Sequence, residues 1–234
     1  TYYRAGEGLV GSWFALVAYA TTAAASKTGL LSGVTNWVKG LWVTDLTTIP
    51  ATIGLPSWGG VVILAGVTGL VVHRFIVLER SRPAQIQLPA RRTGLAHLLL
   101  EKQWNPLATG FLVGVVAVIA WPTSWASGRP DGLGITTPSS NLVNLIVTGD
   151  VKRLDWGVLL VLGILLGSYL AAKASGEFRV RVPSAQVIQR SIAGGVLMGI
   201  GAAWAGGCSI GNALVQTSLL SWQGWIALVF QVLG

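Results

Sequence analysis

Long apolar segments limit what this chain can fold into. In a bilayer, every backbone N–H and C=O group must be bonded within the protein, so segments that cross it form helices. Charged residues make up only 10% of the chain and hydrophobic residues 52%, whereas soluble domains carry roughly 25% charge. We therefore predict an all-α polytopic membrane protein that contacts the lipid bilayer. The expected apolar spans are Leu9–Ala25, Trp58–Leu78, Pro106–Trp121 and Trp156–Ala172.

Two polar connections contain shorter elements. The loop from Lys27 to Ser57 includes an amphipathic piece at Trp37–Val43. The later connection includes Asn141–Val147, which is apolar but too short to cross the bilayer. We expect Asn141–Val147 to form a re-entrant or interfacial helix.

The charges are distributed unevenly, and this predicts the topology. Segments 73–92 and 173–190 are rich in arginine, whereas segment 123–155 balances its basic and acidic residues. The positive-inside rule places the first two segments in the cytoplasm and the third outside. The net charge of +8 then reflects topology and lipid contacts. No basic run alternates with aromatic residues, so we expect no nucleic-acid partner.

The single cysteine, Cys208, follows a glycine pair inside an apolar stretch. The uncharged segment Ser191–Ala205 reads as a helix of about 22 Å, which is too short for a hydrocarbon core of about 30 Å. Gly206 and Gly207 break this helix, and Ser209–Leu220 can begin another. We therefore expect broken half-helices that meet near the bilayer midplane, as in transporter substrate sites.

This break is the candidate substrate-binding site. A thiol at a helix N-terminus meets backbone N–H groups and the positive end of the helix dipole, and its sulfur is polarizable. Such a site suits a small anion that contains sulfur. The alternative is that the cysteine is simply a small buried hydrophobic residue. The candidate residues are Gly206, Gly207, Cys208, Ser209, Ile210, Gly211 and Asn212.

Small residues recur every fourth position before the break, at Gly195, Gly199, Ala203 and Gly207. Such a stripe allows another helix backbone to approach closely. We therefore predict that Gly195 and Gly199 contact a neighbouring helix through their backbone.

Several other kinds of site are excluded by the sequence. It contains no CxxC motif, no HxxxH motif and no carboxylate cluster, so we expect no metal and no cofactor. It also contains no P-loop and no nucleophile–histidine–acid arrangement at membrane depth, so we do not expect an enzyme. Arg4 and Glu7 lie just before the first span. They either face a transport pathway or pair at an interface.

A weak internal repeat is visible, because Trp13–Val17 and Trp225–Val229 match at four of five positions. The chain lacks an initiator methionine and stops inside an apolar run, so we expect it to be part of a longer protein. We assign residues 1–78 to a first repeat whose start is missing and 79–104 to a cytoplasmic linker. Residues 105–234 form a second repeat whose end is missing.

Several blocks of this sequence resemble the YeeE/YedE family of sulfur-compound membrane transporters. They are Gly194–Ala202, Ala205–Gly211, Gly176–Pro183 and Tyr3–Gly8 with Ser12-Trp13. The resemblance implies two inverted repeats in a bacterial inner membrane and uptake of thiosulfate or a related anion. It also implies cysteines at the constriction and a TusA-like sulfur carrier protein as partner. Of those cysteines, only Cys208 has a counterpart in this sequence.

Three functions follow from these observations. The leading interpretation is a transporter that brings a small sulfur-containing anion into the cytoplasm. The second is a membrane sulfurtransferase that forms a persulfide on Cys208 and passes its sulfur to a carrier. The third is a membrane subunit that only packs against partners.

Overall fold

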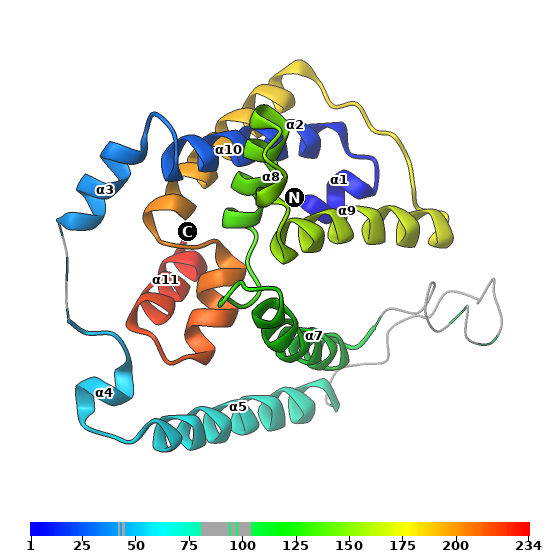
Figure 1. Cartoon of the computed structure of the whole chain (residues 1–234). Helices are drawn as coiled ribbons and strands as arrows, with labels where there is room; N and C mark the ends of the chain where they lie inside the picture. The colour runs from blue at the N-terminus through cyan, green and yellow to red at the C-terminus, as the bar shows by residue number, and fades with distance from the viewer. Residues whose placement is uncertain (42, 44, 81–93, 95–96, 98–103) are drawn as a thin grey trace.

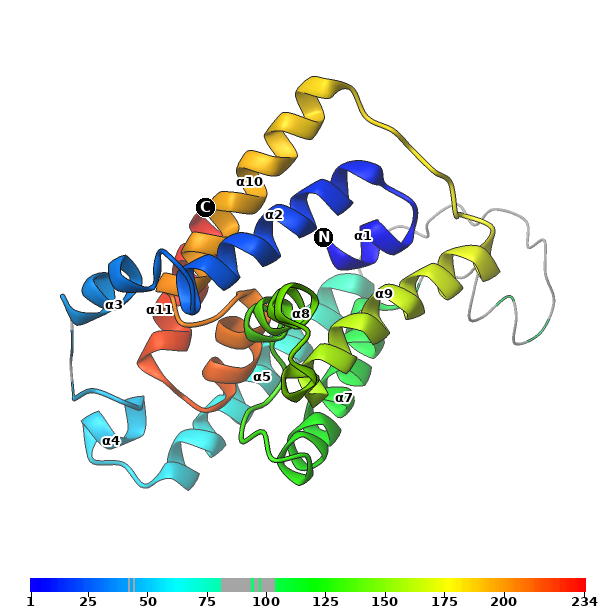
Figure 2. The same ribbon diagram turned by 45° about the horizontal axis from the view of Figure 1, so that its top comes forward.

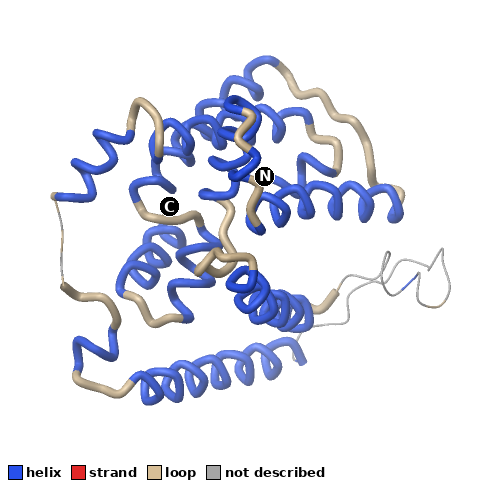
Figure 3. The backbone as a smooth tube through the Cα atoms, in the orientation of Figure 1, coloured by secondary structure: helices blue, strands red, loops and turns tan. Residues whose placement is uncertain are grey.

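The computed structural model describes residues 1–41, 43, 45–80, 94, 97 and 104–234. Within these residues the regular elements are helices, as Figures 1 and 3 show, joined by two isolated β-bridges. The prediction of an all-α protein is confirmed. The elements are α1 (Tyr2–Gly6), α2 (Val10–Lys27), α3 (Ser32–Gly40), α4 (Ile49–Ile53), α5 (Ser57–Arg80), α7 (Pro106–Ala126), α8 (Thr136–Thr148), η1 (Val151–Arg153), α9 (Trp156–Ser175), α10 (Ala185–Trp204), η2 (Ile210–Gln216) and α11 (Trp222–Leu233).

Four of the described helices, α5, α7, α9 and α10, are long and apolar enough to cross a membrane. In the apolar window of α5 none of the residues is buried, and in those of α9 and α10 only 22% are. The large apolar side chains of these helices therefore face outward, where lipid rather than water surrounds them. The chain is a multi-pass membrane protein.

Helix α2 covers the first predicted span but is not one of these four helices. Its buried face packs along α10 and α8, as the adjacent ribbons in Figures 1 and 2 show. Its other face carries exposed apolar side chains such as Phe14 and Val17, while its buried face contributes Leu16 and Tyr19 to a core cluster.

Helices α10 and α7 extend well beyond their predicted boundaries. Helix α10 begins at Ala185 and has 20 residues, so it is about 30 Å long. The prediction that the segment before the glycine break is too short to cross was wrong. It treated Arg190 as a helix boundary, whereas long polar side chains near a helix end can extend to the interface. Helix α7 likewise continues through Pro122 to Ala126.

The glycine stripe packs α10 against α2. A Cβ atom on Gly195 would overlap the carbonyl oxygen of Ala15, and one on Gly199 would lie 2.8 Å from the carbonyl oxygen of Tyr19. Real Cβ atoms essentially never approach so closely. The two backbones are therefore in direct contact, and the predicted role of Gly195 and Gly199 is confirmed.

Helix α8 begins in the interior of the protein. It includes the predicted Asn141–Val147 helix but starts at Thr136, and most of its first turn is buried. The Asn141 amide donates to the carboxylate of Asp155 at 3.0 Å, and the same carboxylate caps the first turn of α9. This bond joins α8 to α9 and helps to fix where the buried turn lies.

Three helix ends that are predicted to lie on the cytoplasmic side point the same way in the view of Figure 1. Figure 1 shows the end of α5, the start of α7 and the end of α9 on the right of the view. The greater part of the predicted linker, 79–104, lies outside the described residues. The predicted Trp37–Val43 piece is helical up to Gly40 within α3, and Trp42 is not among the described residues.

Candidate functional site

The chain turns sharply between α10 and η2, at the predicted glycine pair. Helix α10 ends at Trp204, and Gly206 adopts φ +73°, a left-handed conformation that favours glycine. A Cβ atom on Gly206 would also lie 2.6 Å from the side-chain nitrogen of Gln223. The backbone conformation favours glycine here, and a side chain would in addition displace the Gln223 amide.

A buried asparagine holds the turn in place. The side chain of Asn212 is fully buried, and its Nδ2 donates to the carbonyl oxygens of Gly207 at 2.9 Å and Ala205 at 3.2 Å. Its backbone N–H donates to the carbonyl oxygen of Cys208 at 2.8 Å. These bonds satisfy polar groups that would otherwise be buried without partners. Asn212, a predicted binding residue, therefore also fixes the shape of the turn.

Gln223, in the first turn of α11, takes part in the same hydrogen-bond network. It was not among the site residues predicted from the sequence. Its Nε2 donates to the Ala205 carbonyl oxygen at 2.8 Å and to Oδ1 of Asn212 at 3.0 Å. The only signal for it was an amide within an apolar segment shortly after the cysteine. Its bond to Ala205 joins residues 18 positions apart in the sequence.

The turn brings Cys208 to the central core. The thiol is half-buried and packs against a cluster that contains Tyr2, Tyr19 and Ala202. The tyrosine hydroxyls face α8, where Tyr2 bonds with Ser139 at 2.6 Å and Tyr19 donates to Thr136 at 2.9 Å. Both hydroxyls lie within electrostatic reach of the sulfur. The thiol thus packs against an apolar cluster whose two tyrosines carry hydroxyl groups bonded to α8.

Residues after the cysteine enter a π-helical segment, Ile210–Gln216. Such segments are rare and frequently occur at functional sites. Ile210 packs into a second core cluster with Val215, whereas Ser209 is exposed. A Cβ atom on Gly211 would meet no atom within 4 Å, so no steric contact explains glycine there.

Arg4 and Glu7 lie elsewhere. The exposed Arg4 side chain bonds with the hydroxyl of its neighbour Tyr3, and the Glu7 carbonyl oxygen accepts from the Arg179 N–H at 3.4 Å. Glu7 also lines a polar pocket of about 320 Å³ with Glu177, Arg179 and Arg181. None of the residues that line this pocket belongs to the Cys208 turn.

Comparison with known proteins places the chain in a family. It is 50% identical over its full length to the Escherichia coli protein named thiosulfate transporter TsuA. It is 33% identical, over 99% of its length, to the Spirochaeta thermophila protein of the same name. The chain spans 66% and 68% of the lengths of these relatives. The model of the sulphur transport family matches residues 1–234, and the chain belongs to that family.

Proposed function

We propose that this chain is part of a plasma-membrane transporter that takes up thiosulfate and that Cys208 contacts the anion on its way to the cytoplasm. The observation that carries the proposal is the Cys208 turn. Its thiol is half-buried in the centre of a membrane protein and is held there by buried amide hydrogen bonds. Two relatives named as thiosulfate transporters support the choice of substrate.

The chemistry of the site fits this anion. Thiosulfate carries a terminal sulfur atom that is soft and polarizable, as the thiol of Cys208 is. The hydroxyls of Tyr2 and Tyr19 can donate hydrogen bonds to the oxygen atoms of an anion, once they are released from α8. Sulfate lacks the terminal sulfur, so we expect it to compete poorly at the thiol. The remaining predicted residues, Gly206 to Asn212, shape the turn around the anion.

The larger architecture is also a proposal. Residues 1–78 and 105–234 would belong to two inverted repeats joined by the linker 79–104, with broken half-helices that meet near the midplane. The matching segments Trp13–Val17 and Trp225–Val229 support this, since both lie in helices, α2 and α11. On the cytoplasmic side, the family resemblance supports a TusA-like sulfur carrier protein as the acceptor of the imported sulfur.

Replacing the thiol tests the proposal. We expect Cys208→Ser in the full-length protein to be folded and to lose most thiosulfate uptake, because serine lacks the polarizable sulfur. The assay is growth on thiosulfate as sole sulfur source in a host without its own uptake system, with membrane expression measured in parallel. Met198→Leu is the matched control, since it removes the only other sulfur atom in the chain, on an exposed part of α10.

Normal growth of well-expressed Cys208→Ser would remove the thiol from the mechanism. Mass spectrometry of the wild-type protein during uptake distinguishes transport from sulfur transfer. In sulfur transfer, the Cys208 thiolate attacks the terminal sulfur, the S–S bond of thiosulfate breaks, and sulfite leaves with the bonding electrons. One additional sulfur atom on Cys208 would therefore show a sulfurtransferase, whereas uptake without this adduct supports a transporter.

A further inference from the structure

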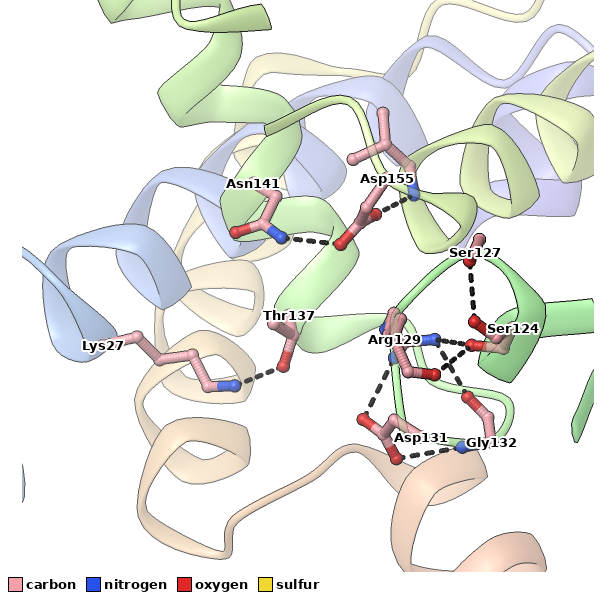
Figure 4. Close-up of polar contacts among 10 residues, drawn as sticks. Lys27, Ser124, Ser127, Arg129, Asp131, Gly132, Thr137, Asn141 and Asp155 are labelled. Atoms are coloured by element: carbon pink, nitrogen blue, oxygen red, sulfur yellow. Dashed lines mark hydrogen bonds and ion pairs between the residues drawn. The ribbon is translucent and has the colours of Figure 1, made fainter. Parts of the chain in front are cut away.

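Lys27 is a half-buried cation that the Cys208 site does not explain. It is the last residue of α2, and its ammonium group donates to the Thr137 hydroxyl at 2.5 Å (Figure 4). Among the described residues no carboxylate forms an ion pair with it. A charge removed from water normally has a charged partner. Lys27 therefore holds an ammonium that is available to an anion.

Two more cations lie near Lys27. The charges of Lys39, on α3, and of Arg129 and Asp131, after α7, all act on the Lys27 ammonium. Arg129 pairs with Asp131 at 3.1 Å and also donates to the Gly132 carbonyl oxygen, so the one nearby carboxylate is already neutralised. The Arg129 side chain is only 12% exposed. Among the described residues, the charged side chains that act on this position are therefore three cations, Lys27 included, and one carboxylate, an excess of two positive charges.

The cluster is connected to the candidate site. Lys27 donates a hydrogen bond to Thr137. The preceding residue, Thr136, accepts a hydrogen bond from the hydroxyl group of Tyr19. Tyr19 belongs to the cluster against which Cys208 packs, and the sulfur lies within electrostatic reach of the Lys27 ammonium. Lys27 and Tyr19 are about 12 Å apart along α2. A small anion at Lys27 is therefore about two helix turns along α2 from Tyr19, a member of the cluster that contacts Cys208.

A structural role for Lys27 is the competing explanation. A cation in the last turn of a helix is stabilised by the helix dipole, and Lys27 occupies that position in α2. This explanation accounts for a charge at Lys27. It does not account for the further positive charges of Lys39 and Arg129, which act on the same ammonium, because like charges repel. The two explanations also predict different measurements, since the structural one affects stability and not substrate affinity.

We propose that Lys27, with Lys39 and Arg129, forms an anion-capture site at the outer mouth of the pathway, which binds thiosulfate before it reaches Cys208. The proposal rests on the proposed function and on the arginine distribution, which predicts segment 123–155 to lie outside. The capture site recognises charge, and the thiol recognises sulfur. Sulfate, a doubly charged anion of similar size, therefore binds at Lys27 and proceeds no further.

The test uses uptake by the full-length protein in proteoliposomes at a series of thiosulfate concentrations. Lys27→Gln keeps a donor for Thr137 but removes the charge. We expect it to raise the half-saturating concentration about tenfold, the effect of losing one partly screened opposite charge. Lys27→Arg keeps the charge, and its half-saturating concentration should stay within about twofold of the wild-type value. Lys152→Gln, at an exposed lysine in η1, is the matched control and should have no effect.

An unchanged half-saturating concentration in folded Lys27→Gln would overturn the proposal while leaving thiosulfate transport intact. If Lys27→Gln does not fold, Lys39→Gln replaces it, because that side chain is exposed. We then expect the half-saturating concentration to rise about threefold. An unchanged half-saturating concentration would overturn the proposal. If the wild-type protein shows no uptake, the proposed function fails. The capture site is then tested by measuring thiosulfate binding to the purified wild-type protein and to Lys27→Gln. Equal binding by wild type and Lys27→Gln, or none by wild type, overturns the capture site.

Discussion

Two pairs of glycines in the same stretch of chain, Gly195 with Gly199 and Gly206 with Gly207, are glycine for different physical reasons. Gly195 and Gly199 lie inside α10 with ordinary helical backbone, and what excludes a side chain there is the backbone of α2. Gly206 lies after the end of α10 and has a positive φ, so a side chain is excluded by the residue's own conformation as well. The first pair makes the bundle compact, and the second shapes the site.

This difference shows how closely spaced glycines can be sorted by function. A glycine whose absent Cβ would meet another backbone is needed for assembly, because backbone cannot give way. A glycine whose absent Cβ would meet a flexible side chain, as Gly206 does with Gln223, is more tolerant of added volume. Substitutions at the two kinds of position should therefore separate stability from transport.

The largest effect is expected for Gly199→Leu. The new side chain would have to enter the space occupied by Tyr19 and Ala23 of α2, which costs about 3 kcal/mol or more because the two backbones must separate. The yield of monodisperse protein and its thermal midpoint measure this. Gly201→Leu, on the same helix where no atom lies within 4 Å, is the control and should remain folded. Similar stability of the two variants would contradict the packing role of the stripe.

A smaller loss of stability, with a clear loss of transport, is expected for Gly206→Ala. Alanine at positive φ costs about 1–2 kcal/mol, and its methyl group displaces the Gln223 amide from the turn. Thermal stability and thiosulfate uptake are measured together. Gly211→Ala is the control for stability, since its Cβ would meet nothing within 4 Å. Full uptake by Gly206→Ala would show that the transport step does not depend on the shape of this turn.

The sequence predicted the helical spans, the contact of the glycine stripe and the cysteine turn, but it did not predict the start of α10 or the distant partners of the turn. The helical spans were predictable, because hydropathy is a property of a continuous segment. The start of α10 was not, because Arg190 looked like a boundary although a polar residue near the interface can continue a helix. The cysteine turn was predictable from Gly206-Gly207-Cys208. Its partners Tyr2 and Tyr19 were not, since their bonds to α8 join residues 137 and 117 positions apart.

The smallest effect is expected at Gln223, and it tests whether the amides that hold the turn act together. Gln223→Ala removes two hydrogen bonds at a partly accessible position, so we expect a loss of about 0.5–1.5 kcal/mol. Asn212→Ala should cost more, because Asn212 is fully buried and its loss leaves the carbonyl oxygen of Gly207 without its side-chain donor. Since Gln223 donates to Asn212 itself, the double variant should lose less than the sum of the single losses. Thermal midpoints of the three proteins measure this, with Gln189→Ala on the exposed part of α10 as control. Strictly additive losses would mean that the two amides hold the turn independently, and Gln223 would then be a peripheral contact of α11 with no share in positioning Cys208.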